Sequence, residues 1–240
     1  MSVRPFAVFD IDGTLIRWQL YHVMVNRLAK HNALDKDALY RLEKARFAWK
    51  NRENPDSFNT YEKISIELQE SALTKVDPKL FDKIAHEAIE EYKDQTYTYT
   101  RDLILRLKAD GYFLLIISGS PNEMVGLIAK QYGFDDFTAT SYERIDNKFT
   151  GKKLVASFDK KLALEQLVAK HSLIYAGSLA IGDSGSDIPM LEMVEQPIAF
   201  NPDQVLYDAA IKAEWKIVVE RKNVIYELRA DSPGNYRLQK

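Results

Sequence analysis

Two aspartates separated by one residue follow a short apolar run near the start of the chain. Residues 6–9, Phe-Ala-Val-Phe, lead directly into Asp-Ile-Asp-Gly-Thr over 10–14. In an extended segment, residues two apart point to the same side, so the carboxylates of Asp10 and Asp12 should lie together. Neighbouring carboxylates repel, which raises a pKa or recruits a cation. A simple turn would explain Asp12 and Gly13 but not an acid directly after four apolar residues.

A segment rich in serine and glycine follows a second apolar run. Residues 112–117, Tyr-Phe-Leu-Leu-Ile-Ile, predict a buried strand, and Ser-Gly-Ser-Pro-Asn-Glu follows over 118–123. Ser120 with the proline and glutamate after it has the spacing of a helix N-cap and capping box. Free N–H groups at that helix start would favour an anion such as phosphate beside Ser118 and Gly119. An ordinary helix cap without a ligand would have the same pattern.

Two further acids and a lysine complete the candidate residues. Asp183 and Asp187 lie in Gly-Asp-Ser-Gly-Ser-Asp over 182–187, after a third apolar run. Lys160 and Lys161 open an amphipathic helix, and either could neutralise a phosphoryl group. Each segment alone is compatible with a loop or a solvated helix start, so the hypothesis of a phosphoryl site depends on their combination.

The surrounding elements predict an α/β fold with a Rossmann-like doubly wound parallel sheet. Continuous apolar runs, typical of strands buried on both faces, alternate with amphipathic helical patterns. Ligand sites in such sheets lie beyond the carboxyl ends of the strands, so the three polar segments should meet at one edge. The expected strands are 6–9, 112–117, 179–181, 197–200 and 216–219, and the expected helices include 101–110, 121–132 and 160–170.

Residues 17–96 have a different pattern, which predicts an inserted helical cap domain. Helical periodicity of apolar residues fills this segment, without a convincing strand. The remainder, 1–16 and 97–240, would form the α/β core domain. Within it, 137–142 and 146–151 are expected to form a hairpin, and the polar last ten residues are expected to be loosely held.

The composition indicates a globular protein and excludes several classes. The chain has 240 residues, a formal net charge of −2 and no cysteine. That charge gives no long-range attraction to nucleic acid or an anionic membrane, and the lack of cysteine excludes disulfides, thiolate zinc sites and cysteine nucleophiles. No segment approaches the ~18 apolar residues of a membrane span, and the start shows no signal-peptide pattern. We therefore expect a cytoplasmic protein without nucleic-acid or membrane partners, of unspecified oligomeric state.

The polar segments, taken in order, resemble the motifs of the haloacid dehalogenase superfamily, within it the phosphoserine-phosphatase-like branch. Residues 10–14 match the first motif, Ile-Ser-Gly over 117–119 the second, and 182–187 the fourth in its D-x-x-x-D form. The third motif is a lone lysine that opens a helix. Apolar residues four and seven places later favour Lys160 over Lys161. The resemblance covers the whole chain, with the helical cap inserted after the first motif.

This resemblance implies a phosphatase that acts through an aspartyl phosphate on a small phosphorylated metabolite. Asp10 would be the nucleophile, and Asp12 would be the general acid and then the base. A magnesium ion, which prefers oxygen ligands, would be held by Asp10, the Asp12 carbonyl and Asp183.

The remaining motif residues would act on the phosphoryl group. The Ser118 hydroxyl, the Gly119 N–H and Lys160 would bind its oxygens and neutralise developing charge. Asp187 would orient Lys160 or a metal-bound water.

The sequence departs from phosphoserine phosphatases at position 19. Those relatives carry a glutamate there, seven residues after the second aspartate, which faces the substrate ammonium; this chain has Gln19. A neutral amide pairs poorly with an ammonium, so phosphoserine is expected to be a poor substrate. Gln19 and Arg17 are expected to contribute to specificity, whereas Trp18 could equally be a packing contact. Ser186 also stands where those relatives usually have asparagine.

Three other functions share parts of this pattern. A phosphotransferase of the same superfamily would need a cap that excludes water and admits an acceptor. A receiver-type signalling domain also uses a phosphorylated aspartate, Mg²⁺ and a lysine, but it is much shorter and lacks the second aspartate. A non-catalytic scaffold of the same fold would only bind partners, although every motif residue is present here.

Overall fold

The computed structural model describes residues 4–232 and 235–239, and the chain divides into two compact units. The first comprises Met1–Arg17, Lys93–Thr140 and Val155–Lys240; the second comprises Trp18–Tyr92 and Ser141–Leu154. Residues 141–154, which were predicted to belong to the core domain, thus lie in the second unit.

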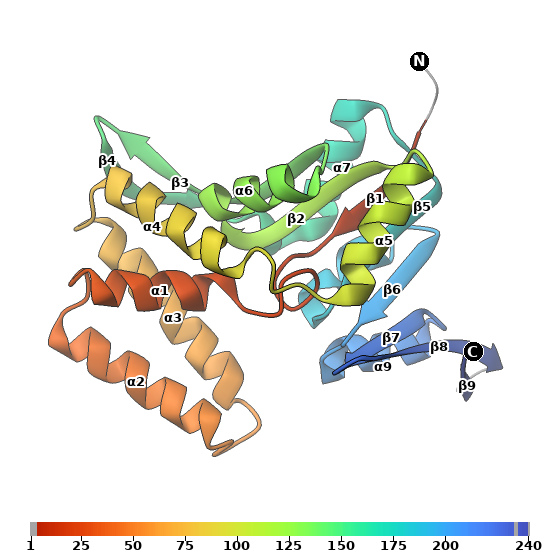
Figure 1. Cartoon of the computed structure of the whole chain (residues 1–240), viewed down its shortest axis with the longest axis horizontal. Coiled ribbons are helices and arrows are strands. Elements are labelled where there is room, and N and C mark those ends of the chain that lie inside the picture. Colours follow the sequence, from red (N-terminus) through yellow and green to blue (C-terminus); the bar gives the residue numbers. More distant parts are fainter. Residues whose placement is uncertain (1–3, 233–234, 240) are drawn as a thin grey trace. The chain divides into compact units, whose positions relative to one another are not determined.

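The first unit is built on a sheet in the order β3-β2-β1-β5-β6-β7-β8-β9 (Figure 1). Pairing is parallel from β3 to β7. Every residue from Phe6 to Phe9 in central β1 is fully buried, as its continuous apolar sequence requires. The parallel strands are β1 (Pro5–Phe9), β2 (Phe113–Pro121), β3 (Asp136–Ile145), β5 (Ile174–Gly182), β6 (Gln196–Phe200) and β7 (Lys216–Arg221).

Helices cover both faces of this sheet, which confirms the predicted doubly wound fold. One face packs through Val8, Leu115 and Ala180 into a core with α7 (Lys160–His171), α8 (Ile188–Leu191) and α9 (Gln204–Lys212). The opposite face is covered by α5 (Thr98–Ala109) and α6 (Asn122–Tyr132). There the Phe9 ring meets the edge of Phe134 at 5.5 Å.

The expectation of a loosely held C-terminal segment is wrong for the residues described. After β7 the chain adds two antiparallel strands, β8 (Val224–Ser232) and β9 (Asn235–Leu238). The Tyr236 hydroxyl lies 2.8 Å from the carbonyl oxygens of both Ala210 and Trp215 and can donate its proton to either. A short polar edge strand is stabilised mainly by backbone pairing, which its composition does not reveal.

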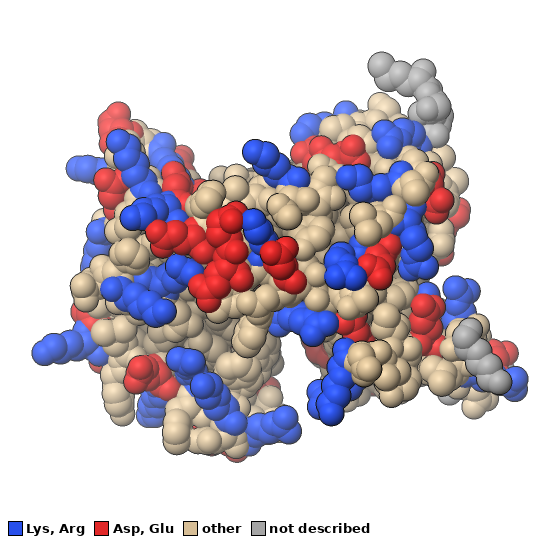
Figure 2. Space-filling model, in the orientation of Figure 1, with Lys and Arg blue, Asp and Glu red and all other residues tan. Residues whose placement is uncertain are grey.

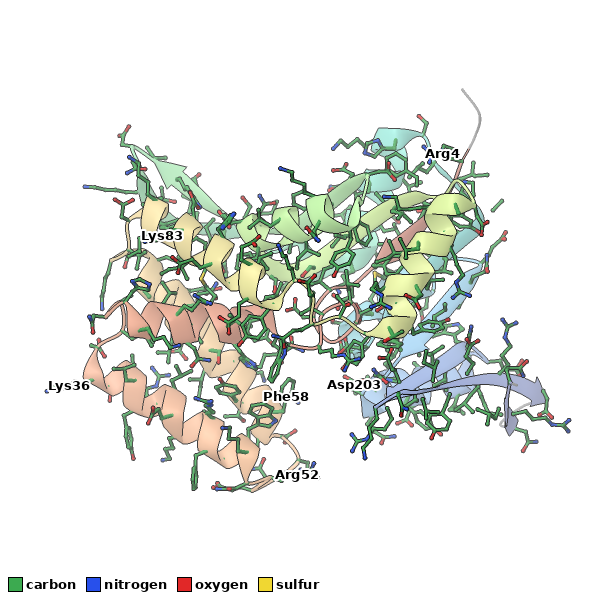
Figure 3. The ribbon with its side chains drawn as sticks, viewed as in Figure 1. Arg4, Lys36, Arg52, Phe58, Lys83 and Asp203 are labelled. Carbon is green, nitrogen blue, oxygen red and sulfur yellow. The ribbon has the colours of Figure 1, made fainter. Side chains whose placement is uncertain are left out.

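The second unit contains α1 (Leu20–Lys30), α2 (Lys36–Lys50), α3 (Ser57–Leu73) and α4 (Pro78–Tyr92). Its interior holds an aromatic cluster in which the His22 ring stacks on Tyr61 at 4.1 Å and Trp49 stacks on the same ring at 5.3 Å. Phe58, labelled in Figure 3, meets His22 edge-on. The helices lie where the helical periodicity was expected, whereas the aromatic cluster was not predicted from it.

A hairpin completes the second unit. The end of β3 pairs antiparallel with β4 (Lys148–Leu154). The connection is Asp146-Asn147, and both residues have positive φ, 49° and 58°, as a two-residue hairpin turn requires. The Phe81 ring of α4 contacts Phe149 edge-on at 5.3 Å, which holds the hairpin to the helices.

Within the described residues, the helices are too short or too polar to span a bilayer. On the face shown in Figure 2, basic and acidic side chains are both widely distributed, in keeping with the near balance of charge in the sequence.

Candidate active site

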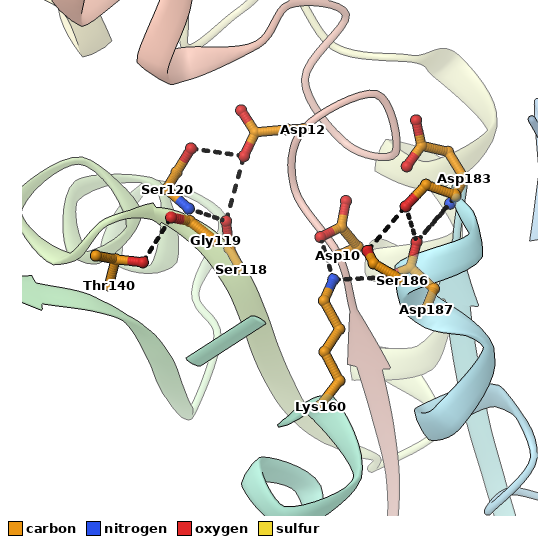
Figure 4. Close-up of polar contacts among 11 residues, drawn as sticks. Asp10, Asp12, Ser118, Gly119, Ser120, Thr140, Lys160, Asp183, Ser186 and Asp187 are labelled. Atoms are coloured by element: carbon orange, nitrogen blue, oxygen red, sulfur yellow. Dashed lines mark hydrogen bonds and ion pairs between the residues drawn. The ribbon is translucent and has the colours of Figure 1, made fainter. Parts of the chain in front are cut away.

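The candidate residues from three segments meet at the carboxyl ends of β1, β2 and β5, all within the first unit (Figure 4). Asp10 directly follows β1, and its N–H donates to the Ile181 carbonyl at 3.0 Å. Because β2 and β5 flank β1 on opposite sides, the chain order reverses at this point, where α/β sheets bind ligands.

Lys160 bridges two of the aspartates. Its Nζ lies 2.7 Å from Asp10 Oδ1 and 2.5 Å from Asp187 Oδ1. All three side chains are buried, whereas Lys161 is exposed. Burial alone would lower the pKa of Lys160, but the carboxylates of Asp10 and Asp187 raise it, so the ammonium stays charged.

Asp187 also fixes the loop after β5. Its Oδ2 accepts the N–H groups of Asp183 and Ser184 at 3.0 Å each, and the Ser184 hydroxyl at 3.2 Å. Asp203, labelled in Figure 3, holds the same loop: its N–H donates to the Asp183 carbonyl at 2.8 Å and its carboxylate accepts the Gly185 N–H at 3.1 Å. The loop is therefore held from both sides.

The donor set at this site fits a divalent cation. Carboxylate oxygens of Asp10, Asp183 and Asp187 lie within 4.8 Å of one another. Among the described residues, nothing donates a hydrogen bond to the Asp183 carboxylate. Burial raises the pKa of Asp10 to about 7 and that of Asp183 well above its usual value, with the neighbouring carboxylates adding to the effect. A cation would relieve this excess of negative charge, and Mg²⁺ prefers such oxygen ligands.

Asp12 is bound by two serines at the end of β2. Its Oδ2 accepts the Ser120 hydroxyl at 2.7 Å and the Ser118 hydroxyl at 3.2 Å. The Gly119 carbonyl accepts the Thr140 hydroxyl at 2.6 Å, which fixes the backbone between them. Ser118 and Gly119, the predicted phosphate-binding residues, therefore lie next to Asp12, the predicted general acid.

Ser120 is not the helix cap that its sequence context predicted. Strand β2 continues to Pro121, so α6 begins at Asn122 with Pro121 as its N-cap and without a side-chain cap hydrogen bond. Because side chains alternate along a strand, Ser118 and Ser120 point to the same side and both reach Asp12. A predicted strand four residues longer would have placed the two serine side chains on the same side.

The structure places the predicted specificity residues in different surroundings. Arg17 Nε donates to the Thr96 carbonyl and Nη2 donates to Glu220, each at 2.8 Å. Gln19, in the second unit, precedes α1, and its side chain makes no cap hydrogen bond. Trp18 meets the Tyr92 ring edge-on at 6.0 Å and is 49% exposed. The roles of Arg17 and Gln19 in specificity remain predictions.

Comparison with known proteins identifies the family. The model for haloacid dehalogenase-like hydrolases matches residues 7–192, and the chain belongs to this family. Phosphoserine phosphatase SerB1 of Mycobacterium tuberculosis is 26% identical over 222 residues, covering 90% of this chain and 71% of that protein. The predicted family is confirmed, together with the prediction that the protein is an enzyme.

Solved structures share the fold. A Bordetella pertussis Tohama I protein of unknown function superimposes with a TM-score of 0.73 at 21% identity, covering 90% of this chain and 98% of that one. A phospho-aspartyl intermediate analogue of phosphoserine phosphatase superimposes with a TM-score of 0.63 at 20% identity, covering 92% and 95%.

Proposed function

We propose that this protein is a Mg²⁺-dependent phosphomonoester hydrolase that acts on a small phosphorylated metabolite through an aspartyl phosphate on Asp10. The observation that carries the proposal is the buried Asp10–Lys160–Asp187 arrangement beside the Asp183 carboxylate, to which no group of the described residues donates a hydrogen bond. Relatives named phosphoserine phosphatase support the same reaction class. Phosphoserine itself is disfavoured because position 19 holds a neutral glutamine.

In this reaction Asp10 is the nucleophile. A carboxylate oxygen of Asp10 forms a bond to phosphorus while the bond from phosphorus to the substrate alkoxide breaks. Asp12 gives its proton to the leaving alkoxide. Asp12 then takes a proton from the water that attacks the aspartyl phosphate, which releases inorganic phosphate and regenerates the Asp10 carboxylate.

The remaining residues neutralise charge. Ser118, the Gly119 N–H and Lys160 would bind the phosphoryl oxygens, where fixed donors stabilise charge that develops in the transition state. Asp187 keeps Lys160 in place through the bond to its ammonium. Asp10, the Asp12 carbonyl and Asp183 would hold Mg²⁺, which when bound neutralises the negative charges of nucleophile and phosphoryl group.

The test measures hydrolysis of p-nitrophenyl phosphate by wild type, Asp10→Asn and the matched control Asp208→Asn at an exposed aspartate of α9. Each is measured with Mg²⁺ and with a chelator. We expect Asp10→Asn to lose activity at least about a thousandfold, because an amide cannot form the acyl phosphate. Asp208→Asn should match wild type, and the chelator should abolish its activity. Activity that persists in Asp10→Asn or in the chelator would contradict the proposal.

A further inference from the structure

Ser120 contacts Asp12 in a way that the roles assigned above do not use. Its side chain is fully buried, and its hydroxyl lies 2.7 Å from Asp12 Oδ2. The same oxygen accepts the Ser118 hydroxyl at the longer distance of 3.2 Å, and the Ser120 N–H donates to Ser118 Oγ at 3.0 Å (Figure 4). Two serines therefore share one carboxylate oxygen.

Phosphate binding would give the hydroxyls of Ser118 and Ser120 different partners. Ser118 has a single hydroxyl proton, so it cannot donate to a phosphoryl oxygen and to Asp12 at the same time. Ser120 already makes the shorter bond to Asp12. Its hydroxyl can donate to an ionised carboxylate or accept from a protonated one, so the contact can persist before and after Asp12 transfers its proton.

We propose that Ser120 is a positioning residue that holds the Asp12 carboxyl at the leaving group while Ser118 binds the phosphoryl group. The inference rests on the proposed function. A group that transfers a proton must stay within hydrogen-bond reach of the reacting oxygen, and a displacement of about 1 Å can cost about a hundredfold in rate. Ser120 thus acts through Asp12, without touching the substrate.

The experiment removes the hydroxyl with Ser120→Ala and, independently, with Ser120→Gly. The matched control is Ser178→Ala, at a fully buried serine of β5 whose hydroxyl oxygen accepts the Glu195 N–H at 3.3 Å. For each protein, kcat/KM is measured with p-nitrophenyl phosphate and with glycerol phosphate, together with the inhibition constant of inorganic phosphate. This kcat/KM reports formation of the aspartyl phosphate, the step in which the leaving group needs its proton.

Glycerol alkoxide needs that proton far more than p-nitrophenolate does. We therefore expect both Ser120 variants to lose at least about tenfold in kcat/KM for glycerol phosphate and much less for p-nitrophenyl phosphate. The inhibition constant of phosphate should stay within about twofold, because Ser118, Gly119 and Lys160 are unchanged. Ser178→Ala should match wild type in all three quantities.

Three results would overturn the inference alone: unchanged kcat/KM, equal losses for the two esters, or weaker phosphate inhibition in the Ser120 variants. Equal losses or weaker inhibition would place Ser120 in phosphate binding or in the integrity of the whole site. A wild-type protein that hydrolyses neither ester would instead refute the proposed function, and the inference with it.

Discussion

At position 13 the backbone passes so close to Asp183 that a side chain does not fit. Gly13 has a φ of +81°, and a Cβ built there would lie 2.0 Å from Asp183 Oδ2. Alanine would therefore strain the turn and displace the carboxylate that is the best candidate for holding Mg²⁺. The close approach explains why glycine follows Asp12.

We expect Gly13→Ala to weaken activation by Mg²⁺ at least about tenfold and to lower kcat. Activity is measured as a function of Mg²⁺ concentration. Gly111→Ala is the control, because Gly111 also has a positive φ, +80°, but no atom of the described residues lies within 4 Å of its added Cβ. It separates backbone strain from displacement of Asp183. The same Mg²⁺ dependence in both variants would contradict this explanation.

Helix α5 receives its N-terminal cap from a distant strand. The buried Glu220 carboxylate of β7 accepts the N–H groups of Thr98 and Tyr99 at 3.0 and 2.9 Å, and it pairs with Arg17 at 2.8 Å. Negative charge is favourable at a helix N-terminus, and the backbone N–H groups there have no other helical partner. One side chain thus fixes the start of α5 and residue 17 together.

Glu220→Ala should lower the free energy of unfolding by about 3 kcal/mol, because it removes charged hydrogen bonds from a buried position. Urea unfolding measures the change. Glu67→Ala is the control: Glu67 pairs with Arg41 in an exposed position and should cost less than about 1 kcal/mol. If the two variants were equally stable, the capping role of Glu220 would be wrong.

The aromatic cluster of the second unit should make folding sensitive to acid. Burial lowers the pKa of His22 to about 3, and its Nε2 has no hydrogen-bond partner among the described residues. Because the unfolded chain has a histidine pKa of about 6.5, it binds the proton more readily, and stability falls as the pH drops below that value.

Between pH 7 and pH 5, this group should reduce the free energy of unfolding by about 2 kcal/mol. His22→Phe keeps an aromatic ring in the stack and should remove that part of the pH dependence. His31→Gln, at an exposed histidine, serves as the control and should retain it. Unfolding curves at several pH values decide the matter, and parallel pH dependence in wild type and His22→Phe would refute the role of His22.

For the whole molecule, substrate choice should depend on a residue outside the α/β unit. Gln19 belongs to the helical unit, and glutamate stands in its place in the phosphoserine phosphatases that the sequence resembles. Gln19→Glu should raise kcat/KM for phosphoserine relative to glycerol phosphate about tenfold, because a carboxylate can pair with the ammonium. Gln204→Glu on α9 is the control. Efficient hydrolysis of phosphoserine by the wild-type protein would show that another residue binds the substrate ammonium.

The sequence alone was enough to predict five strands of the parallel sheet and the polar segments that lie near their carboxyl ends. Buried parallel strands are continuous apolar runs, and Asp10, Asp12, Ser118, Lys160, Asp183 and Asp187 follow or face their ends in a fixed order. These signals are local, because each depends on residue types within a few positions. The same local pattern could not reveal β8 and β9, which depend on pairing with distant strands.

Contacts between distant segments were decided only by the tertiary structure. The local sequence predicts Ser120 as a helix cap. In the structure β2 extends past it, and its hydroxyl donates to Asp12, 108 residues away in sequence. In the structure Arg17 pairs with Glu220, and residues 141–154 belong to the helical unit. A side chain's local context offers several hydrogen bonds of similar free energy, and the folded chain selects among them by bringing particular partners within reach.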